Sequence, residues 1–295
     1  MRVGIILNAV SRKKRKFYSS ILPALQAHHH TTVFETKFAG HARDLAATQG
    51  SNCDVLLAAG GDGTLHQVLN GIMTLPNRPV LGVIPIGSGN DFAGASEIRA
   101  DAKYLLELLQ KPPHSTDIGK IYCHDNCGNA IEEYFMNVCS AGMGPTTVAE
   151  MANMPSWLGA QGRYLAAIVK TFFSHQPEEL ELVSEKFSWK GSARVVAIAN
   201  GKSFGNKIYV APQANLDDGL FNLFVGGDVP LAKFLWYLQH LKNKQKVNAR
   251  QVHYSVASDL VLSSAKPAQL EADGELVGWL PATVRMHNNA INMLR

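Results

Sequence analysis

The sequence lacks any long, uninterrupted apolar segment. No stretch approaches the roughly 18 uncharged apolar residues that a transmembrane helix needs. The most apolar C-terminal region, residues 220–241, is interrupted by Gly226, Gly227, Asp228 and Pro230. The N-terminal sequence MRVGIILNAVSRKKRK has its apolar run before its basic run, whereas a secretory signal has the opposite order. We therefore expect a cytoplasmic protein.

Cysteine and net charge are also low. The four cysteines are Cys53, Cys123, Cys127 and Cys139, and no second pair accompanies Cys123 and Cys127 at zinc-finger spacing. A structural role for the cysteines is therefore favoured over a zinc site. The formal net charge of +4 is compatible with phosphate-bearing ligands or an anionic membrane surface. It is too small to indicate a nucleic-acid partner.

The chain does contain enough apolar sequence for two domains. Its 295 residues are 46% hydrophobic, which suffices for a sizeable core. In the first part, short β-branched runs typical of buried parallel strands occur at residues 2–8, 31–36, 54–59 and 80–86. Helical patterns fit between them at residues 16–27, 41–49 and 65–75. This alternation predicts an open α/β layer arrangement.

From about Asp117 the pattern becomes rich in strands. Residues 119–138 predict a hairpin with its turn at Asn126 to Asn129, and further strands are expected at residues 179–185, 192–200 and 220–227. Helical patterns interrupt them at residues 162–174 and 231–243. The second part is therefore expected to be mostly β, as a sandwich.

The first glycine-rich turn follows the strand at 54–59. Residues 60–63 read GGDG, and the helical pattern after them has an apolar face of Leu65, Val68, Leu69, Ile72 and Met73. Thr64 and Gln67 form a T-x-x-Q capping box, so we expect the helix to begin near Thr64. A glycine turn between a strand end and a helix N-terminus is where open α/β sheets bind ligands, phosphate in particular.

A second turn of the same kind ends the strand at 80–86. It consists of Gly87, Ser88, Gly89, Asn90 and Asp91. Aspartates that cap helices explain either turn alone, but two such turns at one sheet edge favour phosphate and Mg²⁺ chemistry. Other phosphate motifs are missing. GKS at 201–203 has Val196 in place of the P-loop's upstream glycine, and Phe92 breaks a G-x-G-x-x-G pattern.

These two turns resemble the signature loops of a known family. GGDGTLHQVLNG at 60–71 and PIGSGNDFA at 85–93 are similar to loops of the diacylglycerol kinase catalytic-domain family, the lipid kinases that include bacterial diacylglycerol kinases and sphingosine kinases. The resemblance covers nearly the whole chain, through Asn8 with Ser11, Thr36, and the segments 133–144, 200–225 and 271–278. Two residues depart from the family pattern: Ala9 replaces a usual proline, and Gln67 replaces a common glutamate.

The resemblance implies an α/β plus all-β fold. The N-terminal domain would be a phosphofructokinase/NAD kinase-like α/β domain with a parallel sheet, and the C-terminal domain a β-sandwich for the lipid substrate. We expect them to span residues 1–115 and 116–286, with about 287–295 packing back on the first. ATP would bind in the cleft between them. The residues implied at ATP are Asn8, Ser11, Arg12, Thr36, Gly60, Gly61, Gly63, Thr64, Gln67, Gly87, Ser88, Gly89 and Asn90.

The resemblance also implies acidic groups for catalysis and for a metal. Asp273 and Glu275 would be catalytic residues, and Asp218 with backbone carbonyls would hold a structural Mg²⁺ linked through water to Asp62. Asp273 resembles the base proposed in bacterial members, whereas Asp62 resembles the base assigned in sphingosine and NAD kinases. We favour Asp273, although A-D-G-E is by itself also good turn chemistry.

The resulting hypothesis is an ATP-dependent lipid kinase that transfers the γ-phosphate of ATP to the hydroxyl of a lipid such as diacylglycerol. It would be cytoplasmic and transiently membrane-associated, because a lipid acceptor must partly leave the bilayer. Aromatic and basic residues at 172–173 and 233–246 suit this peripheral contact, although core packing explains the aromatic residues equally well. Two alternatives stay open: a soluble-substrate kinase of the NAD kinase type, and a catalytically inactive nucleotide or lipid sensor. Family members are often dimers, so a homodimer is a further expectation.

Overall fold

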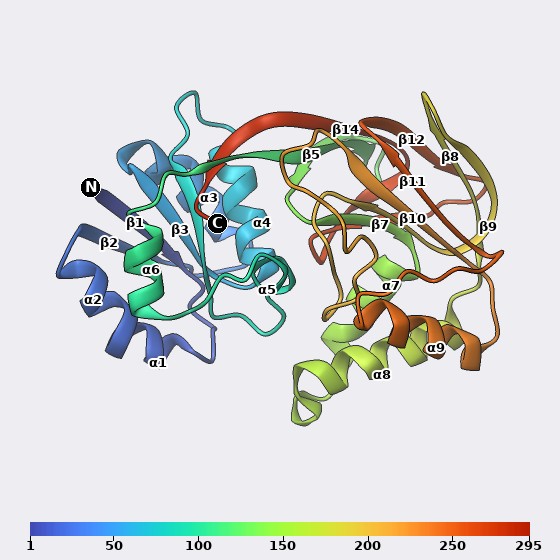
Figure 1. Cartoon of the computed structure of the whole chain (residues 1–295), viewed down its shortest axis with the longest axis horizontal. Coiled ribbons are helices and arrows are strands. Elements are labelled where there is room, and N and C mark those ends of the chain that lie inside the picture. The colour runs from blue at the N-terminus through green and yellow to red at the C-terminus, as the bar shows by residue number, and fades with distance from the viewer. The chain divides into compact units, whose positions relative to one another are not determined.

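The chain divides into two compact units. A computed structural model describes residues 1–151, 153–155, 157–159 and 162–295. Unit 1 consists of Met1–Thr116 with Asn289–Arg295, and unit 2 is Asp117–Asn288 (Figure 1). The domain bounds expected from the sequence lie close to this division.

A parallel sheet forms the centre of unit 1. Its strands follow the order β2-β1-β3-β4 and are β1 (Arg2–Leu7), β2 (His30–Glu35), β3 (Val55–Gly60) and β4 (Val80–Pro85). Every residue of β3 is buried, as expected for a parallel strand that is covered on both faces. Because the four strands are parallel, the loops that follow them meet at one edge of the sheet.

The helices of unit 1 lie between and after these strands (Figure 1). They are α1 (Lys14–Lys16), a π-helical turn (Phe17–Ile21), α2 (Leu22–Gln26), α3 (His41–Gln49), α4 (Asp62–Ile72), α5 (Asp91–Ala95) and α6 (Ala102–Leu108), with a 3-10 turn at Gly50–Asn52. The core that they form with the sheet includes Phe17, Ile21, Leu57 and Leu105.

The predicted start of α4 is wrong. The helix begins at Asp62 with Gly61 as its N-cap residue, so Thr64 lies inside the helix. The hydroxyl of Thr64 accepts a hydrogen bond from Asn8 Nδ2 at 3.2 Å. The expected capping box of Thr64 with Gln67 is therefore not the start of this helix.

The C-terminal residues complete unit 1. They end the long strand β14 (Glu275–Met293), in which Met293 pairs with Leu81 of β4 in parallel. The amide of Leu294 donates to the carbonyl of Leu81 at 2.8 Å, and the Leu294 side chain is buried in the core.

Unit 2 is rich in antiparallel strands. Its main path runs β11-β10-β9-β7-β13-β14, and β5, β6, β8 and β12 join it. The bounds are β5 (His114–His124), β6 (Ala130–Phe135), β7 (Val138–Gly142), β8 (Glu178–Ser184), β9 (Ser188–Ala199), β10 (Phe221–Gly227), β11 (Val252–Ala257), β12 (Asp259–Ser264) and β13 (Gln269–Ala272). The core includes Phe135, Phe221 and Leu262.

Three α-helices accompany this sheet. They are α7 (Met143–Asn153), α8 (Gly159–Ser174) and α9 (Leu231–Lys242), with a 3-10 turn at Ser156–Leu158. The sequence predicted α8 and α9 but not α7. Among the residues that the structure describes, no helix has the length and apolarity needed to span a membrane.

Candidate active site

Two glycine turns of unit 1 lie against each other at the carboxyl edge of the sheet. A Cβ atom on Gly87 would lie 2.3 Å from Gly61 Cα and 2.5 Å from Gly61 N. The amide of Gly87 donates to the carbonyl of Gly60 at 2.9 Å and to Asn90 Oδ1 at 3.0 Å. Glycine at position 87 is therefore required for this close approach, and its amide is already used inside the turn.

Asp62 joins these two turns. Its Oδ2 accepts a hydrogen bond from the amide of Asp91 at 3.0 Å, and its Oδ1 accepts one from the amide of Phe92 at 3.1 Å. These are the first amides of α5, which have no partner within their own helix. Asp62 therefore fixes the second glycine turn relative to the first.

The loop after β1 is bonded to both of these turns. Asn8 reaches Thr64 in α4, and Ser11 Oγ donates to the carbonyl of Ile86 at 2.6 Å. Asn8 Oδ1 also accepts the amide of Val10 at 3.1 Å. The side chains of Asn8 and Ser11 thus hold the loop in place at the sheet edge.

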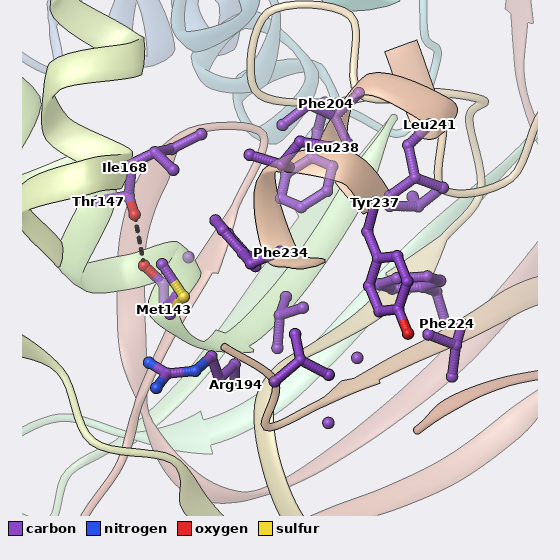
Figure 2. A pocket seen from close by; sticks show the side chains of 18 of the residues that line it. Met143, Thr147, Ile168, Arg194, Phe204, Phe224, Phe234, Tyr237, Leu238 and Leu241 are labelled. Carbon is purple, nitrogen blue, oxygen red and sulfur yellow. Dashed lines mark hydrogen bonds between the residues drawn. The ribbon is translucent and has the colours of Figure 1, made fainter. Parts of the chain in front are cut away.

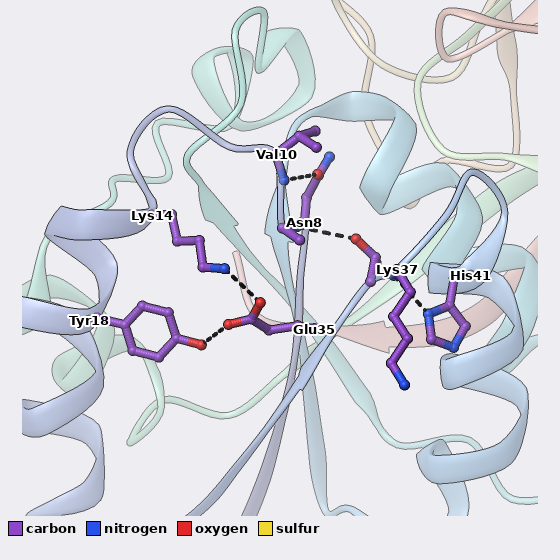
Figure 3. Close-up of polar contacts among 9 residues, drawn as sticks. Asn8, Val10, Lys14, Tyr18, Glu35, Lys37 and His41 are labelled. Carbon is purple, nitrogen blue, oxygen red and sulfur yellow. Dashed lines mark hydrogen bonds and ion pairs between the residues drawn. The ribbon is translucent and has the colours of Figure 1, made fainter.

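The end of β2 carries a second set of polar contacts (Figure 3). Thr36 Oγ1 accepts the amide of Ala9 at 3.1 Å, which ties the loop after β2 to the loop after β1. Glu35 accepts from Lys14 Nζ at 2.6 Å and from the hydroxyl of Tyr18. These two hydrogen bonds lower the pKa of Glu35, whereas burial and the Glu35 contact raise the pKa of Tyr18 to about 12.

The other residues expected at ATP lie at the same edge. Arg12, Ser88 and Gly89 are exposed, and Gly63 and Gln67 are half-buried. The residues expected at ATP thus lie in the loops after β1, β2 and β4, at the end of β3 and in the first two turns of α4.

In unit 2, the candidate catalytic aspartate lies in a strained turn after β13. Asp273 has φ +54° and Gly274 has φ +87°. The Asp273 side chain is buried, and Oδ2 accepts the amide of Met136 at 2.8 Å. Oδ1 accepts the amides of Asn137 at 2.8 Å and Val138 at 3.2 Å. Three backbone donors therefore fix the orientation of this carboxylate.

A second buried carboxylate, Glu271, supports the same turn and was missed by the sequence analysis. Its Oε2 accepts the amide of Gly274 at 3.0 Å, and its Oε1 accepts the hydroxyl of Ser140. Burial, with the nearby Glu271 charge, raises the pKa of the Cys139 thiol well above its usual value. Glu275, which was expected to be catalytic, is exposed at the start of β14.

An apolar cavity of about 80 Å³ lies within unit 2. Figure 2 shows its lining side chains, which come from α7, α8, α9 and neighbouring strands. They include Met143, Ile168, Phe204, Phe224, Phe234 and Leu238. Of the aromatic residues expected to meet a lipid, Phe234 and Tyr237 line the cavity, whereas Phe173 and Trp236 are exposed.

One end of this cavity adjoins the Asp273 turn. Gly144, which lines the cavity, is so close to Ser140 that a Cβ on it would lie 2.0 Å from Ser140 Oγ and 3.4 Å from Glu271 Oε1. Glu271 in turn holds the amide next to Asp273. Gly144 thus joins the lining of the apolar cavity to the Ser140–Glu271 contact that supports the candidate catalytic turn.

Asp218 provides an exposed carboxylate in the turn before β10. Its Oδ1 accepts the amide of Leu220 at 3.1 Å, and the adjacent Gly219 has φ +73° and donates to Asp117 Oδ2 at 2.8 Å. In the described part of the chain, no group of three or more His, Cys, Asp or Glu side chains could hold a metal. One carboxylate with carbonyls of the turn and water still fits Mg²⁺, which keeps several of its waters.

Comparisons with known proteins agree in both units. The family model "Diacylglycerol kinase catalytic domain" matches residues 2–121, and "YegS C-terminal NAD kinase beta sandwich-like domain" matches residues 137–295. Diacylglycerol kinase of Bacillus subtilis (strain 168) is 30% identical over 292 residues, covering 95% of this chain and 91% of that protein. Diacylglycerol kinase of Staphylococcus aureus (strain Newman) is 31% identical, covering 95% and 88%.

Solved structures show the same fold. The crystal structure of a diacylglycerol kinase from Bacillus anthracis has a TM-score of 0.72 at 18% identity and covers 99% of this chain and 96% of that one. Yeast NADH kinase complexed with NADH has a TM-score of 0.54 at 12% identity, with coverages of 99% and 82%. The predicted fold class, an NAD kinase-like α/β domain followed by a β-sandwich domain, is thereby confirmed.

Proposed function

Because the chain belongs to the diacylglycerol kinase catalytic-domain family, whose members are kinases with an alcohol group as acceptor, we propose that it transfers the γ-phosphate of ATP to the hydroxyl of a lipid such as diacylglycerol. The observation that carries this proposal is the apolar cavity next to the Asp273 turn. Polar acceptors such as dinucleotides need polar groups in their pocket. The cavity is lined mainly by aliphatic and aromatic side chains, with Thr147 and Arg194 among its polar members, and this mostly apolar lining favours an acyl chain.

Unit 1 would hold the nucleotide. The N-terminus of α4 is the positive end of its helix dipole, so it would face the phosphates. Asn8, Thr36 and Asp62 keep the surrounding loops in place through the hydrogen bonds described above. When bound, Mg²⁺ neutralises phosphate charge, and Asp218 with the carbonyls of its turn would hold the structural ion. The water-mediated link from that ion to Asp62 stays a prediction.

Unit 2 would bind the lipid and orient its acceptor hydroxyl. Phosphoryl transfer has a loose transition state, so orienting the hydroxyl matters more than early deprotonation. Three backbone amides, those of Met136, Asn137 and Val138, fix the orientation of the Asp273 carboxylate before the lipid binds. We therefore assign Asp273 the role of orienting the attacking hydroxyl and receiving its proton late in the reaction. Glu275 lies two positions further along the chain.

We expect the surface around α8 and α9, two of the helices that line the cavity, to contact the membrane. The 3-10 turn, α8 and α9 expose Trp157 (81%), Phe173 (67%) and Trp236 (53%), and basic residues such as Lys170 and Lys233 accompany them. This combination suits an anionic membrane surface. The cavity of about 80 Å³ is smaller than pockets that enclose drug-sized ligands, roughly 300 Å³ or more. A lipid would therefore enter only as these helices move apart.

The test of this function is incubation of the purified protein with γ-labelled ATP, Mg²⁺ and a total lipid extract in mixed micelles. We expect a labelled lipid, whose mobility and mass identify the acceptor. Label that reaches only water would contradict the proposal, as would label on a soluble alcohol such as a dinucleotide.

Filling the cavity should weaken acceptor binding selectively. Leu238→Trp places a larger ring in the cavity, and we expect the KM for the lipid to rise about 10-fold, an effect typical of altered hydrophobic pockets. Leu235→Trp is the matched control, because Leu235 lies on the same helix but is 38% exposed. Steady-state kinetics with varied lipid in micelles would measure both. A Leu238→Trp enzyme with an unchanged KM for the lipid would place the acceptor elsewhere.

Glu271 should act by positioning the Asp273 turn. Glu271→Ala removes the acceptor for the Gly274 amide, and a loosened turn is expected to lower kcat by roughly 10- to 100-fold. Glu271→Gln can still accept that hydrogen bond, so it should restore most of the activity. Single-turnover kinetics, ATP titration and urea unfolding would be measured on both variants. If the Gln variant were as impaired as the Ala variant, the charge of Glu271 rather than its hydrogen bonds would be required.

A further inference from the structure

An exposed aromatic pair lies in the loop between β2 and α3. Phe38 is 62% exposed, and its ring stacks on that of His41 with a centroid distance of 4.5 Å and an interplanar angle of 21°. His41 Nδ1 accepts the amide of Lys37 at 3.0 Å (Figure 3). The His41 ring is therefore held in place by the backbone and supports one face of Phe38. A single exposed apolar side chain is ordinary, so its position must decide whether it has a role.

The pair lies in the loop after β2, at the end of the row of loops that is farthest from the second glycine turn. The glycine turns follow β3 and β4, whereas Phe38 follows β2, and β1 lies between β2 and β3. Two steps across a sheet amount to roughly 10 Å. This is the order of distance that separates the phosphates of a nucleoside triphosphate from its base. Phosphates at the glycine turns would thus direct the base toward the loops after β1 and β2.

The two loops at that end form one connected surface. The amide of Ala9 donates to Thr36 Oγ1, so the loop after β1 is bonded directly to the loop that carries Phe38. Val10, in the loop after β1, is 86% exposed. Figure 3 shows Val10 and His41 at the same end of the strands. Exposed apolar surface is therefore present on both loops.

We propose that Phe38, supported by His41, is the stacking platform for the nucleobase of ATP, an inference that rests on the proposed function. Aromatic side chains stack on every base, since every base has a π-face. The platform supplies affinity for the base and leaves phosphate binding to the glycine turns.

The experiment compares two probes on the full chain by isothermal titration calorimetry with Mg²⁺: ATP, and inorganic triphosphate, which has no base. Phe38→Ala should weaken ATP binding by about 10-fold or more, as expected for the loss of one stacked base, and should leave triphosphate binding unchanged. Phe38→Tyr should bind ATP like the wild type. Val183→Ala, at an exposed apolar residue of β8 (43% exposed), is the control and should change neither affinity.

The other outcomes separate the platform from the proposed function. Unchanged ATP affinity in Phe38→Ala would overturn the platform and leave the kinase proposal standing. Equal losses for ATP and triphosphate would also overturn it, since the substitution would then act on the phosphate loops. A wild-type protein that binds neither probe would overturn the use of ATP, and the platform with it.

Discussion

Asp273→Asn is expected to lower kcat for lipid phosphorylation by about 10²- to 10⁴-fold, the range that a positioned acid–base group contributes. Asparagine tolerates the left-handed backbone at this position, φ +54°, so the turn itself should survive. Its Nδ2 group, however, would meet one of the amides of Met136, Asn137 or Val138, which need an acceptor. Single-turnover transfer from labelled ATP in micelles measures the loss.

The matched control is Asp125→Asn in the β5–β6 turn of the same unit. The Asp125 carboxylate also accepts backbone amides, from Cys127 at 2.8 Å and Asn129 at 2.9 Å, but the residue is only half-buried and lies outside the candidate site. We expect its kcat to stay within about twofold of the wild type, as for most surface changes. If Asp273→Asn also kept a kcat within about twofold of the wild type, Asp273 would have no part in the reaction.

The competing aspartate should behave differently. Because both oxygens of Asp62 hold the first amides of α5, Asp62→Asn disturbs the second glycine turn. It should therefore weaken ATP binding as well as turnover, whereas Asp273→Asn should lower turnover with ATP binding retained. If Asp62→Asn lost turnover while keeping full ATP affinity, Asp62 would replace Asp273 as the base.

The sequence predicted those parts of the fold that depend on local pattern. β-branched runs located the four parallel strands of unit 1, and the Gly-Asp turns at their ends fall at one sheet edge as expected. The start of α4 was missed because Gly61 adopts an extended conformation and serves as the N-cap. The partners of the Asp62 carboxylate lie about thirty positions away in the chain. A local capping rule contains no information on such a partner.

Long-range pairing explains what was missed in unit 2. Glu271 could be seen in the sequence, but its role depends on β13 lying next to β7, which places Ser140 opposite Glu271. The cavity depends in addition on α7, whose first turn contains Gly144 and Pro145, two residues of low helix propensity. Packing against the sheet overrides that weak local preference. Motifs therefore located the candidate catalytic turn, whereas finding the apolar cavity required the fold.

Gly87→Ala is expected to abolish tight nucleotide binding, with ATP affinity lowered at least about tenfold, and to cost about 1–3 kcal/mol of unfolding free energy, as overpacking typically does. The new Cβ would lie 2.3 Å from Gly61 Cα. Gly61 Cα belongs to the backbone, and an alanine Cβ has no rotatable bond that could move it away, so the two turns must separate. ATP titration and urea unfolding of the full chain would measure the two effects.

The control is Gly94→Ala in α5, where the described residues leave open space around a Cβ. Alanine should there be neutral or stabilise by a few tenths of a kcal/mol or more, because it reduces the freedom of the unfolded chain. If Gly87→Ala kept wild-type ATP affinity while losing stability, the contact of the two turns would serve folding alone. Loss of ATP affinity in Gly87→Ala but not in Gly94→Ala would instead show that the nucleotide needs the two turns held at their present separation.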